Sequence, residues 1–179
     1  CDWYLSFGRS ERYMRQPDCA TPLEALKAML AGRMKFNVWN KLVRRSLYAD
    51  GQVSFPEGYA MGEDMTMMLL FAVASKVAHV PRAFYHYVKL NAGAYSRNFS
   101  LRHWESVRHN IRRVEAALRG CGDLDLDLEI ACMKLEAKFP FLMSGDREMY
   151  RLWMLNYPEA NAYILKNRYV SFRRRAVQW

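Results

Sequence analysis

Two adjacent acids, Glu63 and Asp64, have the residue types and the placement to do chemistry. They stand between Gly62 and the apolar run MTMMLLFAVA. An acid in the first turn of a helix is stabilised by free backbone N–H groups and by the positive end of the helix dipole, so capping alone would explain both. The same N–H groups hold a carboxylate in a fixed direction, which also suits a general base. On these residues alone, both interpretations stay open.

Basic and aromatic side chains on either side of the acid pair are further candidates. Lys41, Arg44 and Arg45 could contact phosphates, although a solvated basic face is the commoner outcome for such residues. Trp39 could stack on a sugar ring or lie in the core. Tyr87 could line a pocket or pack within a strand. Their positions alone do not separate these alternatives.

Metal-binding patterns are weak in this sequence. Asp123-Leu-Asp125-Leu-Asp127 has closely spaced carboxylates, but a calcium loop would need Gly and Glu where the chain has Leu128 and Lys134. We predict a helix start there, with favourable first-turn acids. Three histidines have no partner at ligand spacing and are assigned no role: His79, His103 and His109. Four cysteines lack zinc-ligand spacing and indicate lone buried thiols in a reducing compartment: Cys1, Cys19, Cys121 and Cys132.

Helical patterns dominate the chain, and strands are few. The clearest helix start is Thr21-Pro22, with Glu24 at the capping-box position. The strongest amphipathic stripe runs from Trp104 to Leu118. We predict helices over 21–32, 36–51, from 62 onward, 100–120, 122–139, 146–156 and 158–168. We predict strands over 2–7 and on both sides of Pro81, and a loop over 8–18.

Composition and charge bound the class of protein. The 179 residues are 51% hydrophobic and 14% aromatic, enough to build a core in about one domain. The longest apolar run, 65–74, is roughly half of the ~20 residues that a membrane span requires, and no signal-peptide pattern is seen. Because the sequence opens at Cys1 without Met, we expect it to be cut from a longer chain. The net charge is +9, and five basic residues but no acid follow Ala160, so that end should seek anionic surfaces.

Several short motifs stand in a fixed order around the acid pair: Trp39-x-Lys41-Leu42, Phe55-Pro56-Glu57-Gly58, Gly62-Glu63-Asp64, a hydrophobic helix, Val77-Ala-x-Val-Pro and Tyr85-x-Tyr87. In this order and at this spacing they resemble the second half of the catalytic domain of family 2 glycosyltransferases, the A-type nucleotide-sugar transferases of bacteria. The resemblance covers about residues 36–99, and weakly 1–30. It implies a helix-dominated α/β chain with few short strands: the acceptor-side half of the catalytic domain over 1–99, then a helical extension over 100–179.

The resemblance also implies residue roles. Asp64 would be the base that deprotonates the acceptor hydroxyl for in-line, inverting attack, and Glu63 would position it or bind acceptor. The implied substrate-binding residues are Trp39, Lys41, Arg44, Tyr87, Ser96 and Arg97. Where the family often shows Gly-Ser-x-Ser, this chain has Gly-Ala-Tyr-Ser-Arg over 93–97, which departs from the donor-contact pattern.

The family further uses a D-x-D motif upstream of the acid pair to hold Mg²⁺ or Mn²⁺ on the nucleotide diphosphate. The D-x-D letters at 123–127 come after the acid pair, so we expect the metal ligands before Cys1 and none within this chain. The chain alone is therefore expected to be inactive.

The expected partners are a nucleotide-sugar donor and a glycan or lipid-linked acceptor, in the cytoplasm. We also expect peripheral contact with the inner face of the membrane through Arg173, Arg174 and Arg175, with a flexible solubilising end as the alternative. No motif indicates nucleic acid. The rival interpretation of the whole chain is a basic helical module that docks on a membrane surface or on another protein, without catalysis, in which the acid pair only caps a helix.

Overall fold

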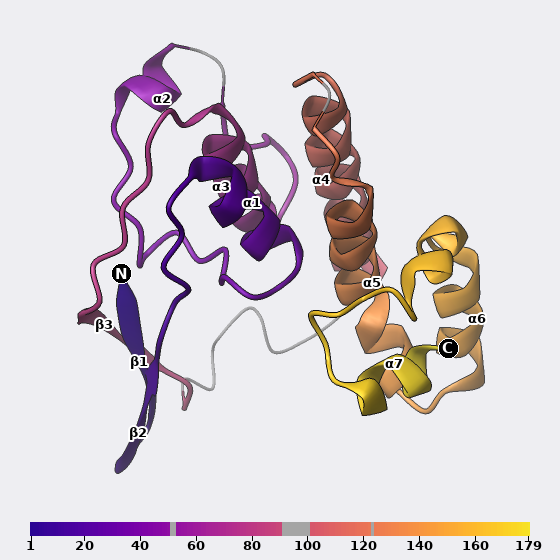
Figure 1. Cartoon of the computed structure of the whole chain (residues 1–179). Helices are drawn as coiled ribbons and strands as arrows, with labels where there is room; N and C mark the ends of the chain where they lie inside the picture. The colour runs from indigo at the N-terminus through magenta and orange to yellow at the C-terminus, as the bar shows by residue number, and fades with distance from the viewer. Residues whose placement is uncertain (51–52, 91–100, 123) are drawn as a thin grey trace.

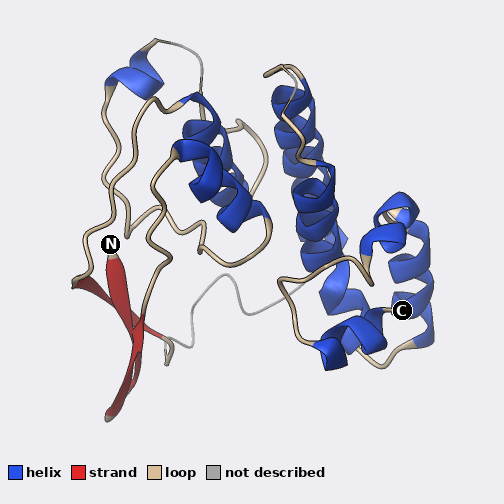
Figure 2. Ribbon diagram, viewed as in Figure 1, coloured by secondary structure: helices blue, strands red, loops and turns tan. Residues whose placement is uncertain are grey.

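The structure is a computed structural model that describes residues 1–50, 53–90, 101–122 and 124–179. A small sheet lies at one end of the molecule and a group of helices at the other (Figure 2). The broad prediction of a helix-dominated α/β chain with few short strands is confirmed.

The sheet has three strands in the order β2-β1-β3. β1 (Asp2–Phe7) pairs antiparallel with β2 (Ser10–Met14) and parallel with β3 (Ala83–Val88). The loop predicted over 8–18 is therefore wrong in part. β2 is exposed along almost its whole length, so it carries no hydrophobic alternation that would reveal a strand. β3 confirms the strand predicted after Pro81, whereas the residues just before Pro81 form no strand.

Four helices share the larger hydrophobic core: α1 (Pro22–Leu30), α3 (Gly62–Val73), α4 (Leu101–Arg119) and α5 (Asp127–Met143). The predicted start of α1 is confirmed, because the Thr21 hydroxyl accepts from Glu24 N at 3.1 Å and the Glu24 carboxylate accepts from Ala20 N at 2.9 Å. Core residues come from both sides of the boundary predicted at 99–100, including Leu70 and Ile111. The two predicted parts thus share one core.

The helix predicted over 36–51 is wrong apart from one turn, α2 (Ser46–Ala49). Residues 36–45 follow an irregular path, and the Lys41 side chain donates hydrogen bonds to the carbonyls of Lys35 and Asn37. A helix would use these carbonyls for its own internal bonds. The side chain thus supports a loop that residue periodicity cannot reveal.

The C-terminal helices pack around α5 and form a second core (Figure 1). α6 (Arg147–Leu155) confirms one predicted helix, while the helix predicted over 158–168 is a shorter 3₁₀ helix, η2 (Pro158–Tyr163), and α7 (Phe172–Gln178) was not predicted. The buried Lys138 ammonium joins these elements, because it donates to the carbonyls of Trp153, Asn156 and Tyr157 at 2.8–3.2 Å and to Asn161 Oδ1 at 2.7 Å. A buried ammonium needs such acceptors to offset its lost hydration.

Only one of the four thiols fully matches the prediction of lone buried cysteines. Cys132 is buried, Cys1 and Cys19 are half-buried, and Cys121 is exposed, all with free thiols. None of the helices described by the structure is long and apolar enough to cross a bilayer.

Replacing Gly62 by Ala should destabilise the fold at the start of α3. A Cβ atom at this position would lie 2.1 Å from Pro56 Cγ and 2.6 Å from Pro56 Cδ, so the proline loop would have to move. We expect a loss of about 2 kcal/mol in the free energy of unfolding, measured by urea denaturation. Gly120→Ala is the matched control, since its nearest atom would be Ala117 O at 3.4 Å. Equal denaturation midpoints for the two variants would contradict the close packing of Pro56 on Gly62.

Candidate active site

α3 presents the acid pair at its first turn, as the sequence predicts. Glu63 is exposed and Asp64 is half-buried, and the next six residues, 65–70, are all buried. No side chain caps the helix at Met61, whose φ of 59° turns the chain sharply into α3. The rigid, buried stretch behind Asp64 fixes the backbone that carries its carboxylate.

α4 holds the loop that leads into the acid pair. Asn110 Nδ2 donates to the carbonyl of Ala60 at 3.1 Å, and the Arg113 guanidinium donates to the carbonyl of Ser54. Both carbonyls belong to the loop of residues 53–60. Two side chains one turn apart on a core helix therefore fix the segment that positions Gly62 and Asp64.

A stacked pair of rings also joins α4 to the loop of residues 53–60. The His109 ring lies over the Tyr59 ring, with centroids 3.6 Å apart and planes 4° apart. His109 was assigned no role from sequence, and neither Asn110 nor Arg113 was singled out. His109 and Asn110 contact residues 50 positions earlier in the sequence, so no local sequence pattern indicates these contacts.

Lys41 brings a positive charge to the neighbourhood of Asp64. Its ammonium donates to Lys35 O at 2.5 Å, Asn37 O at 2.7 Å and Asn40 Oδ1 at 2.9 Å. These three acceptors match its three N–H donors, so a phosphate oxygen would have to displace one of them. Lys41 thus fixes the shape of its own loop while its charge acts on Asp64.

The Asp64 carboxyl group titrates far above an ordinary aspartate. Burial raises its pKa to about 7, the charge of Glu63 adds to the rise, and the charge of Lys41 opposes it. Burial in turn lowers the pKa of Lys41 to about 8, which the charge of Asp64 opposes. A carboxylate with a pKa near neutrality can accept a proton and release it again at physiological pH, as a general base must.

Trp39 lies flat on two tyrosines of β3. Its ring stacks on Tyr85 at 4.3 Å and on Tyr87 at 5.4 Å, and Trp3 from β1 meets Trp39 edge-on at 5.0 Å. Tyr85 and Tyr87 lie two residues apart, on the same face of the strand, as predicted. This aromatic cluster fixes the loop that carries Lys41 against the sheet.

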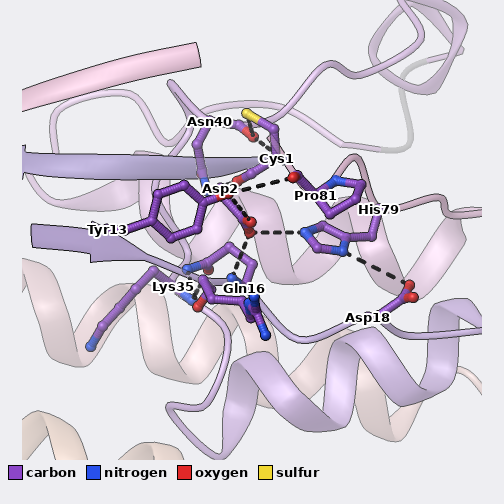
Figure 3. A network of polar contacts seen from close by, with 10 residues as sticks. Cys1, Asp2, Tyr13, Gln16, Asp18, Lys35, Asn40, His79 and Pro81 are labelled. Carbon is purple, nitrogen blue, oxygen red and sulfur yellow. Dashed lines mark hydrogen bonds and ion pairs between the residues drawn. The ribbon is translucent and has the colours of Figure 1, made fainter. Parts of the chain in front are cut away.

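Polar contacts also tie the loop of residues 35–41 to Cys1, just before β1, and to Gln16, after β2 (Figure 3). The backbone nitrogen of Cys1 donates to Asn40 O at 2.9 Å, and Asn40 Nδ2 donates to Cys1 O at 3.0 Å. Lys35 N donates to Gln16 Oε1 at 3.1 Å. Three backbone and side-chain contacts therefore fix the loop from both ends.

A buried carboxylate at the start of β1 completes this network (Figure 3). Asp2 is 1% exposed and accepts from Tyr13 Oη at 2.6 Å and Gln16 N at 2.8 Å, while His79 Nε2 lies 2.9 Å away. Burial works against the charged form, but the hydrogen bonds from Tyr13, Gln16 and His79 hold the pKa of Asp2 below its ordinary value. His79, assigned no role from sequence, thus links the segment after α3 to the sheet.

A cavity of about 680 Å³ lies beside this framework. Lys41 and Arg44 line it together with Lys76 and His79, and no carboxylate is among its lining residues. Its other walls are largely apolar, so its chemistry suits a ligand with both an anionic and an apolar part. Asp64, Trp39 and Tyr87 are not among the lining residues.

Two predicted site residues, Ser96 and Arg97, lie outside the described residues. The structure brings Lys41 and Asp64 within range of each other's charge, and Trp39 and Tyr87 into one stack. Within the described ranges, no three side chains of the His, Cys, Asp or Glu types gather as a metal site. The described residues therefore do not offer such a cluster as a ligand set for Mg²⁺ or Mn²⁺.

Comparison of this chain with protein-family models, with curated proteins and with solved structures finds no match.

Asp64→Asn should stabilise the fold above neutral pH and leave it nearly unchanged in acid. A raised pKa means that folding favours the protonated carboxyl group. This contribution is complete below the ordinary value of 3.8 and is lost as the pH rises through about 7. We expect the variant to gain on the order of 1–2 kcal/mol in the free energy of unfolding above pH 7, from urea titrations at acid and alkaline pH.

Asp127→Asn is the matched control for this experiment, because Asp127 lies in the first turn of α5 with a side chain 61% exposed. It should show no comparable gain at alkaline pH. A constant difference between Asp64→Asn and wild type at all pH values would contradict the burial of Asp64.

Proposed function

We propose that this chain is the acceptor-side part of an inverting family 2 glycosyltransferase, with Asp64 as the general base. The observation that carries the proposal is the half-buried Asp64 carboxyl group with a pKa of about 7, positioned at the start of a core helix beside the charge of Lys41. The ordered motifs from Trp39 to Tyr87 supply the family resemblance. A helix cap requires neither the burial of Asp64 nor the contacts by which Asn110 and Arg113 fix the preceding loop.

The proposed step moves one proton and one sugar. Ionised Asp64 takes the proton of an acceptor hydroxyl, the freed oxygen forms a bond to the anomeric carbon of the donor sugar, and the bond from that carbon to the phosphate oxygen breaks. The nucleoside diphosphate leaves with the electron pair, and the configuration inverts. Glu63, exposed beside Asp64, is proposed to position it or to bind acceptor.

The substrate contacts remain proposals of the same kind. Arg44 lines the cationic cavity and could bind a phosphate of the leaving group or of a lipid-linked acceptor. Lys41 is proposed to act through its charge, since its donors are engaged. Trp39 and Tyr87 are proposed to bind substrate, and Ser96 and Arg97 are kept as candidate substrate-binding residues. The metal ligands are proposed to lie in a preceding segment of a longer, cytoplasmic chain.

The rival is a membrane- or protein-docking module without catalysis. One observation favours a docking role: the C-terminal helix α7 exposes Phe172 and Val177 on its surface. Asp64 is not part of α7, and docking through α7 does not require the raised pKa of Asp64. The docking role is therefore compatible with the transferase proposal and does not replace it.

The test uses a chain that includes the preceding segment and measures release of nucleoside diphosphate from a panel of nucleotide sugars. Asp64→Asn should lower the rate at least about 100-fold, because a positioned general base contributes that much or more. The wild-type rate should rise with pH and level off above about 7, as Asp64 becomes ionised.

Asp127→Asn again serves as the control and should keep the wild-type rate. Full activity of Asp64→Asn would contradict the assignment of the base. Absence of release with every nucleotide sugar would contradict the transferase proposal as a whole.

A further inference from the structure

The last helix of the chain, α7, is fixed to the molecule through one of its faces. On that inner face the Arg174 guanidinium pairs with Glu136 at 2.5 Å and lies over the Phe139 ring at 4.0 Å, and Gln178 is 4% exposed. Arg174 and Gln178 are four residues apart, so they share one side of the helix. The orientation of α7 is therefore set by its contacts with α5.

The opposite face of α7 carries large apolar side chains in contact with solvent. Phe172, at the start of α7, is 74% exposed, and Trp179, its C-cap residue, is 83% exposed. They are seven positions apart, which corresponds to about two helical turns, so both lie on one face. Large apolar side chains gathered on one exposed face indicate an interaction surface.

Leu165 extends this surface beyond the helix. Arg175 donates to the carbonyl of Leu165 at 3.1 Å, and its guanidinium lies 5.9 Å from the centre of the Phe172 ring. Leu165 itself is 58% exposed. We call Leu165, Phe172 and Trp179 together the α7 apolar face.

The chain segment that forms this face carries charge of one sign. Five basic residues and no acid lie between Ala160 and the end of the sequence. The three arginines predicted to contact a membrane differ in the structure: Arg173 is exposed, while Arg174 binds Glu136 and Arg175 binds the Leu165 carbonyl. Arg173, with the exposed Lys166, is therefore the best placed to meet an anion.

We propose that the α7 apolar face docks on an anionic membrane surface. Phe172 and Trp179 enter the boundary between headgroups and acyl chains, where aromatic side chains are favoured, and Arg173 and Lys166 face the lipid phosphates. The arrangement fits a membrane better than nucleic acid, because its centre is apolar and its charges lie at the rim. This surface is separate from Asp64, so the proposal does not rest on transfer chemistry.

Vesicle sedimentation tests the proposal. The chain should bind phosphatidylcholine vesicles that contain one-third phosphatidylglycerol, bind phosphatidylcholine alone much more weakly, and lose affinity as salt increases. Replacing Phe172 and Trp179 together by Ser should lower the affinity at least about tenfold, since two large apolar side chains no longer leave water. Arg173→Gln should lower it about fivefold, the effect of one basic residue near an anionic surface.

Leu42→Ser is the matched control, because Leu42 is fully exposed in a loop far from α7 in the sequence. It should bind as wild type does. Equal losses in Leu42→Ser and in the double variant would overturn the proposal, as would salt-sensitive binding to RNA without binding to vesicles.

Quenching by brominated lipid locates the contact. Trp3, Trp104 and Trp153 are 5% exposed or less, and Trp39 is half-buried and stacked on Tyr85 and Tyr87. Wild-type quenching by lipid bound at α7 should therefore come mainly from Trp179. Trp179→Phe should keep most of the binding and lose most of the quenching. Unchanged quenching in Trp179→Phe would place the contact elsewhere and overturn the proposal.

Discussion

The half-buried carboxyl group of Asp64 is a charge that the start of α3 must hold partly out of water. Removing a carboxylate from water is unfavourable, and the adjacent charge of Glu63 adds to the effect, so the pKa rises to about 7. The charge of Lys41 compensates in part. A partly buried carboxylate such as that of Asp64 keeps its position only if other contacts fix the backbone around it.

Two sets of contacts hold the backbone near Asp64. In the first set, α4 binds the 53–60 loop through Asn110 and Arg113. In the second set, Cys1 and the aromatic stack on β3 fix the Lys41 loop. α1, α3, α4 and α5 share one hydrophobic core. α4 and α5 therefore contribute to the position of Asp64, although the family resemblance ends before them.

The features that sequence predicts well are those with local causes. The start of α1 follows from Thr21 and Glu24, and the first-turn acids of α3 follow from their place before an apolar run. The irregular loop around Lys41 could not be predicted, because its side chain binds carbonyls that a helix would otherwise use. β2 escaped prediction because an exposed strand has no hydrophobic alternation. The roles of Asn110 and His79 depend on contacts 50 and 77 residues away in sequence, which leave no local signal.

Carbon NMR of the folded chain, with aspartate carboxyl groups labelled by ¹³C, tests the central claim most directly. The Asp64 signal is assigned by its absence in Asp64→Asn and is followed as the pH is raised. A titration midpoint near 7 is the result expected for a carboxyl group buried beside Glu63 and Lys41. A midpoint near the ordinary value of 3.8 would show that Asp64 is a solvated helix cap and would contradict its role as a positioned base.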